Sequence, residues 1–82
     1  MVSERMEDYL EAIEEVAGER GYAKVVDVSK RLGIAPSSVT EMFQKLSEEG
    51  YIHYEKYRGV TLTDRGKAVA KDTKNRHETL KT

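Results

Sequence analysis

The stretch "DVSKRLGIAPSSVTEMFQKL", residues 27–46 of an 82-residue chain, decides the fold. Its first part, Asp27–Leu32, is typical of a short helix, and Gly33 tolerates the left-handed backbone that ends many helices. After "GIA", a proline suits the first turn of a second helix, which we expect over Pro36–Glu49. Two helices joined by a tight glycine-containing turn predict a helix-turn-helix.

Apolar residues in this stretch recur at helical spacing. In the second helix they stand at i, i+3, i+4 and i+7, namely Val39, Met42, Phe43 and Leu46. In the shorter first helix, Val28 and Leu32 stand one turn apart and should face inward. One apolar face on each helix predicts that both pack onto a shared core.

Before this stretch, residues 3–20 form a third helical pattern. Their apolar residues recur at spacings of three and four, Ser3 is a plausible N-cap, and the chain reaches a stop signal at Gly21. The next segment, "YAKVV" (residues 22–26), can form only a short extended piece. Val26 stands where a polar cap is expected, because the following helix is predicted to begin at Asp27.

After the stretch comes a hairpin pattern and one more helix. "YIHYEKYRGVTL", residues 51–62, contains strand-forming Tyr and Ile, and Arg58-Gly59 supplies the turn. Thr63 makes a good N-cap for a helix that starts at Asp64, an acid at the positive end of the helix dipole. That helix runs through "NRHETLKT", residues 75–82, without a Gly or Pro, so we expect the chain to be cut inside it.

This order of elements predicts a winged helix-turn-helix fold. The class is mainly α (α+β): a three-helix core, a two-stranded β-hairpin wing and a C-terminal linking helix. We expect residues 1–70 to form the DNA-binding domain. Residues 71–82 would begin a helix leading to a dimerisation domain that is absent from this chain.

Composition and charge limit the possible functions. One small domain is expected, and the absence of cysteine excludes disulfides and thiolate metal sites. No apolar run is long enough for a membrane span, and the acidic start lacks a signal core, so we expect a cytoplasmic protein. Residues 1–20 hold seven acids and two bases, a net of −5, whereas residues 21–82 hold eight acids and twelve bases, a net of +4. The remainder of the chain therefore contains a possible basic face.

Polar residues on the second helix of the helix-turn-helix, and on the wing, are candidates for binding double-stranded DNA. A helix fits the major groove, and its first residues meet base edges or phosphates. The candidates are Pro36, Ser37, Ser38, Thr40, Glu41, Gln44 and Lys45 on the helix, and Lys56, Tyr57 and Arg58 on the wing. Serines in such positions are often only helix caps, and an acid such as Glu41 repels phosphate. The prediction of DNA binding therefore depends on all of these candidates together and not on any single residue.

Two acids in the first helical pattern and a distant histidine form a possible metal site. Asp8 and Glu11 stand three residues apart and hence lie on one helix face. With the neutral imidazole of His77 they would suit a divalent ion such as Mn²⁺ or Fe²⁺. Judged from the residues alone, acids on such a helix are mostly solvated surface, and His77 is more often a surface residue than a ligand.

The motifs "MEDYLEAI", "APSSVT", "YEKYRGVTLTDRGK" and "RHE" resemble the DtxR/MntR family of metal-dependent repressors over nearly the whole chain. The resemblance implies an N-terminal winged-helix domain followed by a helical dimerisation domain. It implies a homodimer that, loaded with Mn²⁺ or Fe²⁺, represses metal-uptake genes at a DNA operator. Asp8, Glu11 and His77 match family ligands, and an acid at position 8 resembles the manganese branch. The family's other ligands, two glutamates and a second histidine, would come from beyond residue 82.

Two other functions remain open. The chain could be a winged-helix DNA-binding regulator without metal dependence, or a winged-helix module for protein interaction, with the acidic first helix as the docking surface. No small-molecule substrate is expected. An enzyme is not expected either, because the sequence contains no nucleophile–base pair and no phosphate-binding loop.

Overall fold

Four helices and a two-stranded sheet make up the computed structural model. It describes the backbone of residues 3–55 and 58–80, and the side chains of these residues up to Thr73. The elements follow the order α1 (Glu4–Arg20), α2 (Val25–Leu32), α3 (Pro36–Glu48), β1 (Ile52–Glu55), β2 (Gly59–Leu62) and α4 (Asp64–Leu80). Helices dominate, and the predicted winged helix-turn-helix is confirmed.

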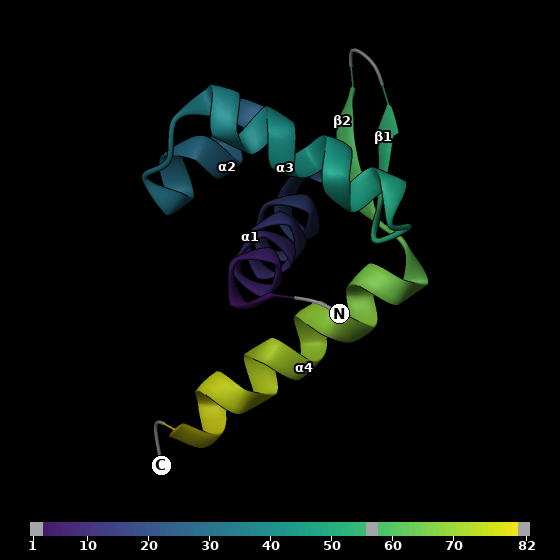
Figure 1. The fold of residues 1–82 in the computed structure, drawn as a ribbon. Coiled ribbons are helices and arrows are strands. Elements are labelled where there is room, and N and C mark those ends of the chain that lie inside the picture. Colours follow the sequence, from purple (N-terminus) through teal and green to yellow (C-terminus); the bar gives the residue numbers. More distant parts are fainter. Residues whose placement is uncertain (1–2, 56–57, 81–82) are drawn as a thin grey trace.

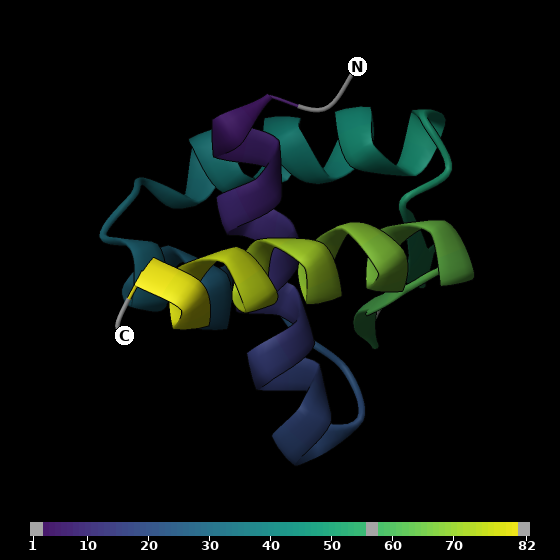
Figure 2. The ribbon, with the colours of Figure 1, turned by 90° about the horizontal axis from the view of Figure 1, so that it is seen from below.

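Helix α1 lies in the middle of the molecule. In Figure 1, α2 and α3 cover one side of it and α4 lies on the other, while the hairpin stands beside α3. Seen from below in Figure 2, α4 crosses α1, and its C-terminal end lies on the same side of α1 as α2. Helix α1 packs against α2, α4 and strand β2, so it connects all the other layers.

The core comes from one face of each element, as the spacing of the apolar residues predicted. Buried hydrophobic side chains are Met6, Tyr9, Leu10, Ala12, Ile13, Ala23, Val28, Val39, Phe43, Leu46, Tyr51, Ile52, Val60, Leu62 and Ala70. Burial of one large apolar side chain contributes about 1.5–3 kcal/mol, so this cluster supplies the main force for folding. In the described residues, no helix is long and apolar enough to cross a membrane.

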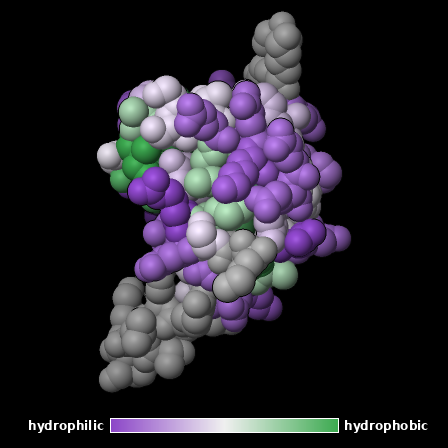
Figure 3. Space-filling view, in the orientation of Figure 1, coloured by the Kyte–Doolittle hydropathy of each residue, from purple (hydrophilic) through white to green (hydrophobic). Residues whose placement is uncertain are grey.

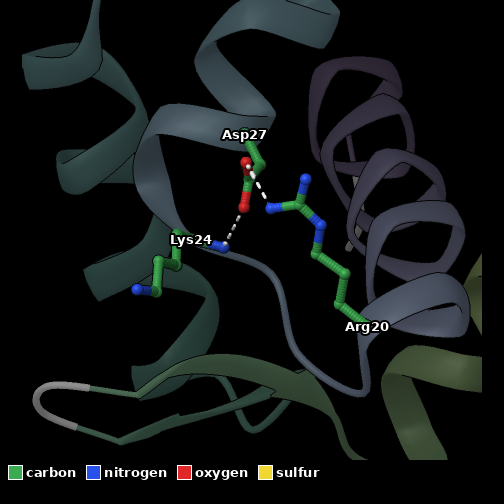
Figure 4. Close-up of polar contacts among 3 residues, drawn as sticks. All are labelled: Arg20, Lys24 and Asp27. Atoms are coloured by element: carbon green, nitrogen blue, oxygen red, sulfur yellow. Dashed lines mark hydrogen bonds and ion pairs between the residues drawn. The ribbon is translucent and has the colours of Figure 1, made fainter.

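The start of α1 is confirmed, whereas the predicted start of α2 is wrong. The Ser3 hydroxyl accepts a hydrogen bond from the Met6 backbone N–H at 3.2 Å, as expected of an N-cap. Helix α2 begins at Val25, two residues before the predicted Asp27. The Asp27 carboxylate reaches back to the Lys24 backbone N–H at 3.3 Å and so stabilises the earlier start (Figure 4). The cap therefore comes from inside the helix, and a polar residue at position 26 is not required.

Strand β2 pairs with β1 and also with the segment before α2. The hairpin is antiparallel, with Ile52 opposite Leu62. On its other side, Val60 exchanges backbone hydrogen bonds of 2.8 and 2.9 Å with Ala23. The predicted extended piece at 22–26 is thus reduced to one bridging residue. Gly59 belongs to β2 rather than to the turn, and a Cβ there would lie 2.6 Å from the Ala23 carbonyl oxygen. Only glycine fits this close approach.

The predicted start of α4 is confirmed. The Thr63 hydroxyl accepts from the Gly66 backbone N–H at 3.1 Å and donates to the Gly50 carbonyl at 2.7 Å. Gly66 lies directly on the backbone of Tyr51, since a Cβ at Gly66 would be 2.0 Å from the Tyr51 carbonyl oxygen. The helix then continues without a break across residues 70 and 71, and Thr73 is still buried.

Candidate nucleic-acid interface and metal-ligand cluster

The predicted DNA-binding residues of α3 lie on its outer face. Val39, Phe43 and Leu46 are buried against the core, and Met42 is half-buried. The opposite face carries the exposed candidates, which are Pro36, Ser37, Ser38, Glu41, Gln44 and Lys45. Rigid packing of the inner face therefore presents these six side chains together to solvent.

The start of α3 has no side-chain cap among the described residues. Its N-cap is Ala35, and Pro36 occupies the first helical turn. Ser38 donates its backbone N–H to the Ala35 carbonyl at 3.0 Å, but neither serine hydroxyl closes the helix end. The interpretation of these serines as caps is therefore wrong. Pro36 has no N–H, and the Ser38 and Val39 N–H groups donate to the Ala35 carbonyl, so among the described residues the Ser37 N–H is the first-turn donor left for an anion such as a DNA phosphate, with no acid in that turn to compete.

Thr40 differs from the other candidates on α3. It is half-buried, and its hydroxyl donates to the Pro36 carbonyl at 3.1 Å. Its proton is therefore used within the helix, and only its oxygen remains to accept a hydrogen bond. Its side chain supports the first turn of α3 more than it extends the outer face.

In the wing, the structure places one of the three candidates. Arg58 is exposed and forms an ion pair with Glu55 at 3.6 Å, in which both side chains are largely in water. Lys56 and Tyr57 lie outside the described residues. Tyr54, which sequence reasoning missed, is 50% exposed on β1 and lines a cleft with Lys24 and Arg58. The sequence does not indicate that Tyr54 is exposed beside two cations, because a tyrosine in a strand pattern is expected to be buried.

Two ion pairs connect α1 to α2. The Arg20 guanidinium contacts Asp27 at 3.2 Å (Figure 4), and Arg31 of α2 contacts Glu15. Each pair is partly exposed and contributes at most about 1 kcal/mol. They add polar contacts at the α1–α2 interface, whose position is fixed mainly by the buried apolar core.

The surface over the start of α3 differs from the rest of that helix. In Figure 3 the area over the α2–α3 turn and the beginning of α3, at the left, is green to pale, whereas purple hydrophilic side chains cover much of the face elsewhere. Ile34 and Leu32 are partly buried apolar residues in this region, next to the small serines. Small side chains allow close approach of another backbone, which suits insertion into a groove of DNA.

The first-helix acids lie on the side of α1 that faces α2. Asp8 is exposed and lines a groove with Leu32 and Ile34, and Glu11 is half-buried one turn further along. Glu15, on the same stripe, contacts Arg31. Two carboxylates one turn apart, one of them partly shielded from water, fit a divalent cation that prefers oxygen ligands.

His77 cannot be compared with these acids directly, because its side chain lies outside the described residues. Across the side chains of 3–55 and 58–73, no group of three or more possible ligands is placed to hold a metal. The backbone of α4 does continue through Leu80 and packs on α1.

A helix-turn-helix whose second helix is exposed on its outer face, with an adjoining β-hairpin, is the arrangement of winged-helix DNA-binding domains. Residues 1–60 match the family model described as "Iron dependent repressor, N-terminal DNA binding domain". The chain belongs to this family of metal-dependent repressors, which is a family of transcriptional regulators and not of enzymes.

Named relatives agree with this membership, and a solved structure shares the fold. The chain is 49% identical over 80 residues to the HTH-type transcriptional regulator MntR of Bacillus subtilis (strain 168), and 48% identical to that of Lysinibacillus sphaericus (strain C3-41). These alignments cover 98% of the chain but only 56% and 58% of the relatives, so the chain spans little more than half of their length. A crystal structure of a hypothetical protein from Sulfolobus solfataricus matches 84% of the chain and 53% of its own, with a TM-score of 0.76 and 34% identity.

Proposed function

We propose that this chain is the DNA-binding part of a cytoplasmic, Mn²⁺-responsive transcriptional repressor. Its partner is a double-stranded DNA operator, and the longer protein acts as a homodimer that represses metal-uptake genes. The observation that carries the proposal is the start of α3, where Ser37 and Ser38 are exposed and none of the side chains that the structure describes caps the helix. The start of α3 would meet the major groove, and Arg58 of the wing would meet the adjacent backbone.

DNA binding is tested with the 82-residue chain and a short duplex of arbitrary sequence, by fluorescence anisotropy over a series of salt concentrations. We expect weak binding, with a dissociation constant of about 10⁻⁴–10⁻⁶ M near physiological salt, that weakens steeply as salt rises. Lack of binding at low salt by a chain with intact helical circular dichroism would contradict the DNA proposal. Binding of a protein partner that duplex DNA does not displace would favour a protein-interaction module.

We further propose Asp8, Glu11 and His77 as this chain's share of a metal site. Two carboxylates and a neutral imidazole suit Mn²⁺, with Fe²⁺ as the alternative, and α4 packs directly on the helix that carries both acids. By bridging α1 and α4, a metal would hold the winged helix in one position relative to whatever follows α4. Metal can favour the DNA-binding arrangement only by binding it more tightly than the alternatives.

The metal site is tested by titrating the chain with Mn²⁺ and measuring the free ion by electron paramagnetic resonance. Ligands from beyond this chain are expected in the relatives' longer proteins, so we expect weak binding here. Asp8→Asn should weaken it by at least about tenfold. Glu19→Gln is the matched control, because it removes the same charge from an exposed position at the other end of α1. Equal effects of the two substitutions would favour a regulator that uses no metal.

A further inference from the structure

A groove runs between the N-terminal part of α1 and the outer face of α3. Arg5 and Tyr9 of α1 line one side, and Ser38, Glu41 and Lys45 of α3 line the other. Three of the proposed DNA-contacting residues thus share a groove with Arg5. The sequence places Arg5 in the most acidic segment of the chain, where a nucleic-acid contact is not expected.

Arg5 is exposed and lines this groove. Arg5 and Tyr9 stand one helical turn apart on α1 and line the groove together with Ser38 of α3. Tyr9 is only 2% exposed, so it forms the floor of the groove, whereas Arg5 is exposed at its edge. The ion pairs found within residues 3–55 and 58–73 do not include Arg5.

The charge of Arg5 changes the balance of the outer face of α3. Glu41 and Lys45 stand one turn apart there and offset each other, which leaves little net charge for attracting phosphate. Arg5 adds one exposed cation next to Ser38, in the first turn of α3. A guanidinium presents several N–H donors in a planar fork that matches phosphate oxygens.

We propose that Arg5 contacts the DNA phosphate backbone, so that the interface extends from α3 across the groove onto α1. This inference rests on the proposed DNA-binding function. With α3 in the DNA major groove, the phosphate backbone beside that groove would run along the N-terminal part of α1. Arg5 would then contact a phosphate, while Ser38 and Lys45 would face the major groove. Such a contact positions the protein on the duplex without reading sequence.

The test compares the salt dependence of duplex binding between the wild-type chain and Arg5→Gln, by fluorescence anisotropy. Loss of one phosphate contact should lower the slope of log K against log salt by about 0.9. Arg5→Lys should keep most of the slope. Lys67→Gln is the control, since it removes one exposed positive charge from α4, on the side of α1 away from α3 (Figure 1).

The outcomes separate this inference from the proposed function. If the wild-type chain binds duplex and Arg5→Gln retains its full slope, Arg5 is not a phosphate contact, although the DNA-binding function stands. If Arg5→Gln and Lys67→Gln lower the slope of log K against log salt equally, the proposed Arg5 contact is also contradicted. Such a result would show that only the net charge of the chain matters. Failure of the wild-type chain to bind contradicts the proposed function itself. Thermal unfolding followed by circular dichroism checks that the variants remain folded.

Discussion

Helices α3 and α4 both follow a tight connection, yet their starts differ. At the start of α4, Thr63 closes the helix with its hydroxyl, Gly66 lies on Tyr51, and the Arg65 guanidinium stacks over the Tyr51 ring at 4.7 Å. At the start of α3, the N-cap is Ala35 and no side chain among the described residues closes the end. The first arrangement stabilises the fold, and the second leaves the Ser37 N–H for a ligand. We therefore expect substitutions at the two starts to separate stability from DNA binding.

The largest effect is expected for Gly66→Ala at the start of α4. The new methyl group would lie 2.0 Å from the Tyr51 carbonyl oxygen, so the backbone of one element must move. We expect a loss of about 3 kcal/mol or more in the free energy of unfolding, measured by urea denaturation. Gly18→Ala is the control, because nothing lies within 4 Å of that position in α1 and alanine favours helix there. A similar loss at both positions would mean that close packing is not the cause.

The next effect is expected for Thr63→Ala. It removes two hydrogen bonds, to the Gly66 N–H and the Gly50 carbonyl, and should cost about 1–2 kcal/mol in the same measurement. Ser38→Ala at the start of α3 is the comparison, and we expect it to change stability by less than about 0.5 kcal/mol while weakening duplex binding. Should Ser38→Ala destabilise the fold as much as Thr63→Ala, the two helix starts would not differ as proposed.

A gain of stability is expected for Ala35→Asp, which supplies the missing cap of α3. The carboxylate would accept from a first-turn N–H and should add about 0.5–1 kcal/mol. It would also occupy the Ser37 N–H and repel phosphate, so duplex binding should weaken. Ala35→Asn tests the role of charge, because it caps equally well but adds none. If either variant gains stability with unchanged DNA affinity, the open start of α3 is not part of the interface.

The smallest effect concerns Tyr9, which lies under the groove beside α3. Burial raises its pKa above 10.0, with Arg5 opposing part of the rise. The neutral hydroxyl is therefore favoured in the folded state. The stability that comes from burying the neutral Tyr9 hydroxyl is fully present below the unfolded-state pKa. It is lost as pH rises through the higher folded-state pKa. Urea denaturation between about pH 8 and about pH 11 should show a smaller loss of stability for Tyr9→Phe than for the wild type. A steeper loss in Tyr9→Phe would contradict this sign.

Much of the fold follows from local signals in the sequence. Ser3 and Thr63 are recognisable as caps, and the apolar spacing of Val39, Met42, Phe43 and Leu46 identifies the inner face of α3. The exposed residues of α3 follow directly, because they occupy the positions that this spacing leaves outside. The metal-ligand trio stays a prediction, since it depends on His77.

Other features depend on contacts that no local signal describes. Helix α2 begins at Val25 because Asp27 caps it from within and Ala23 pairs with Val60, which lies 37 positions further along the chain. Thr40 was predicted as a DNA contact from its residue type, but its hydroxyl bonds within the helix. Arg5 was not predicted, because only the packing of α1 against the helix-turn-helix brings it to the edge of α3.

The sequence alone determined the order of elements, their inner faces and the family, because spacing, caps and turn residues act over a few positions. Tertiary structure decided three further points. It requires glycine at positions 59 and 66, where backbones from distant segments meet. It leaves the start of α3 open, and it places Arg5 beside Ser38 and Lys45. The glycine requirement and the position of Arg5 arise between residues far apart in the chain, so close packing determines them, whereas the open start of α3 became visible only once the structure showed that Ala35 is its N-cap.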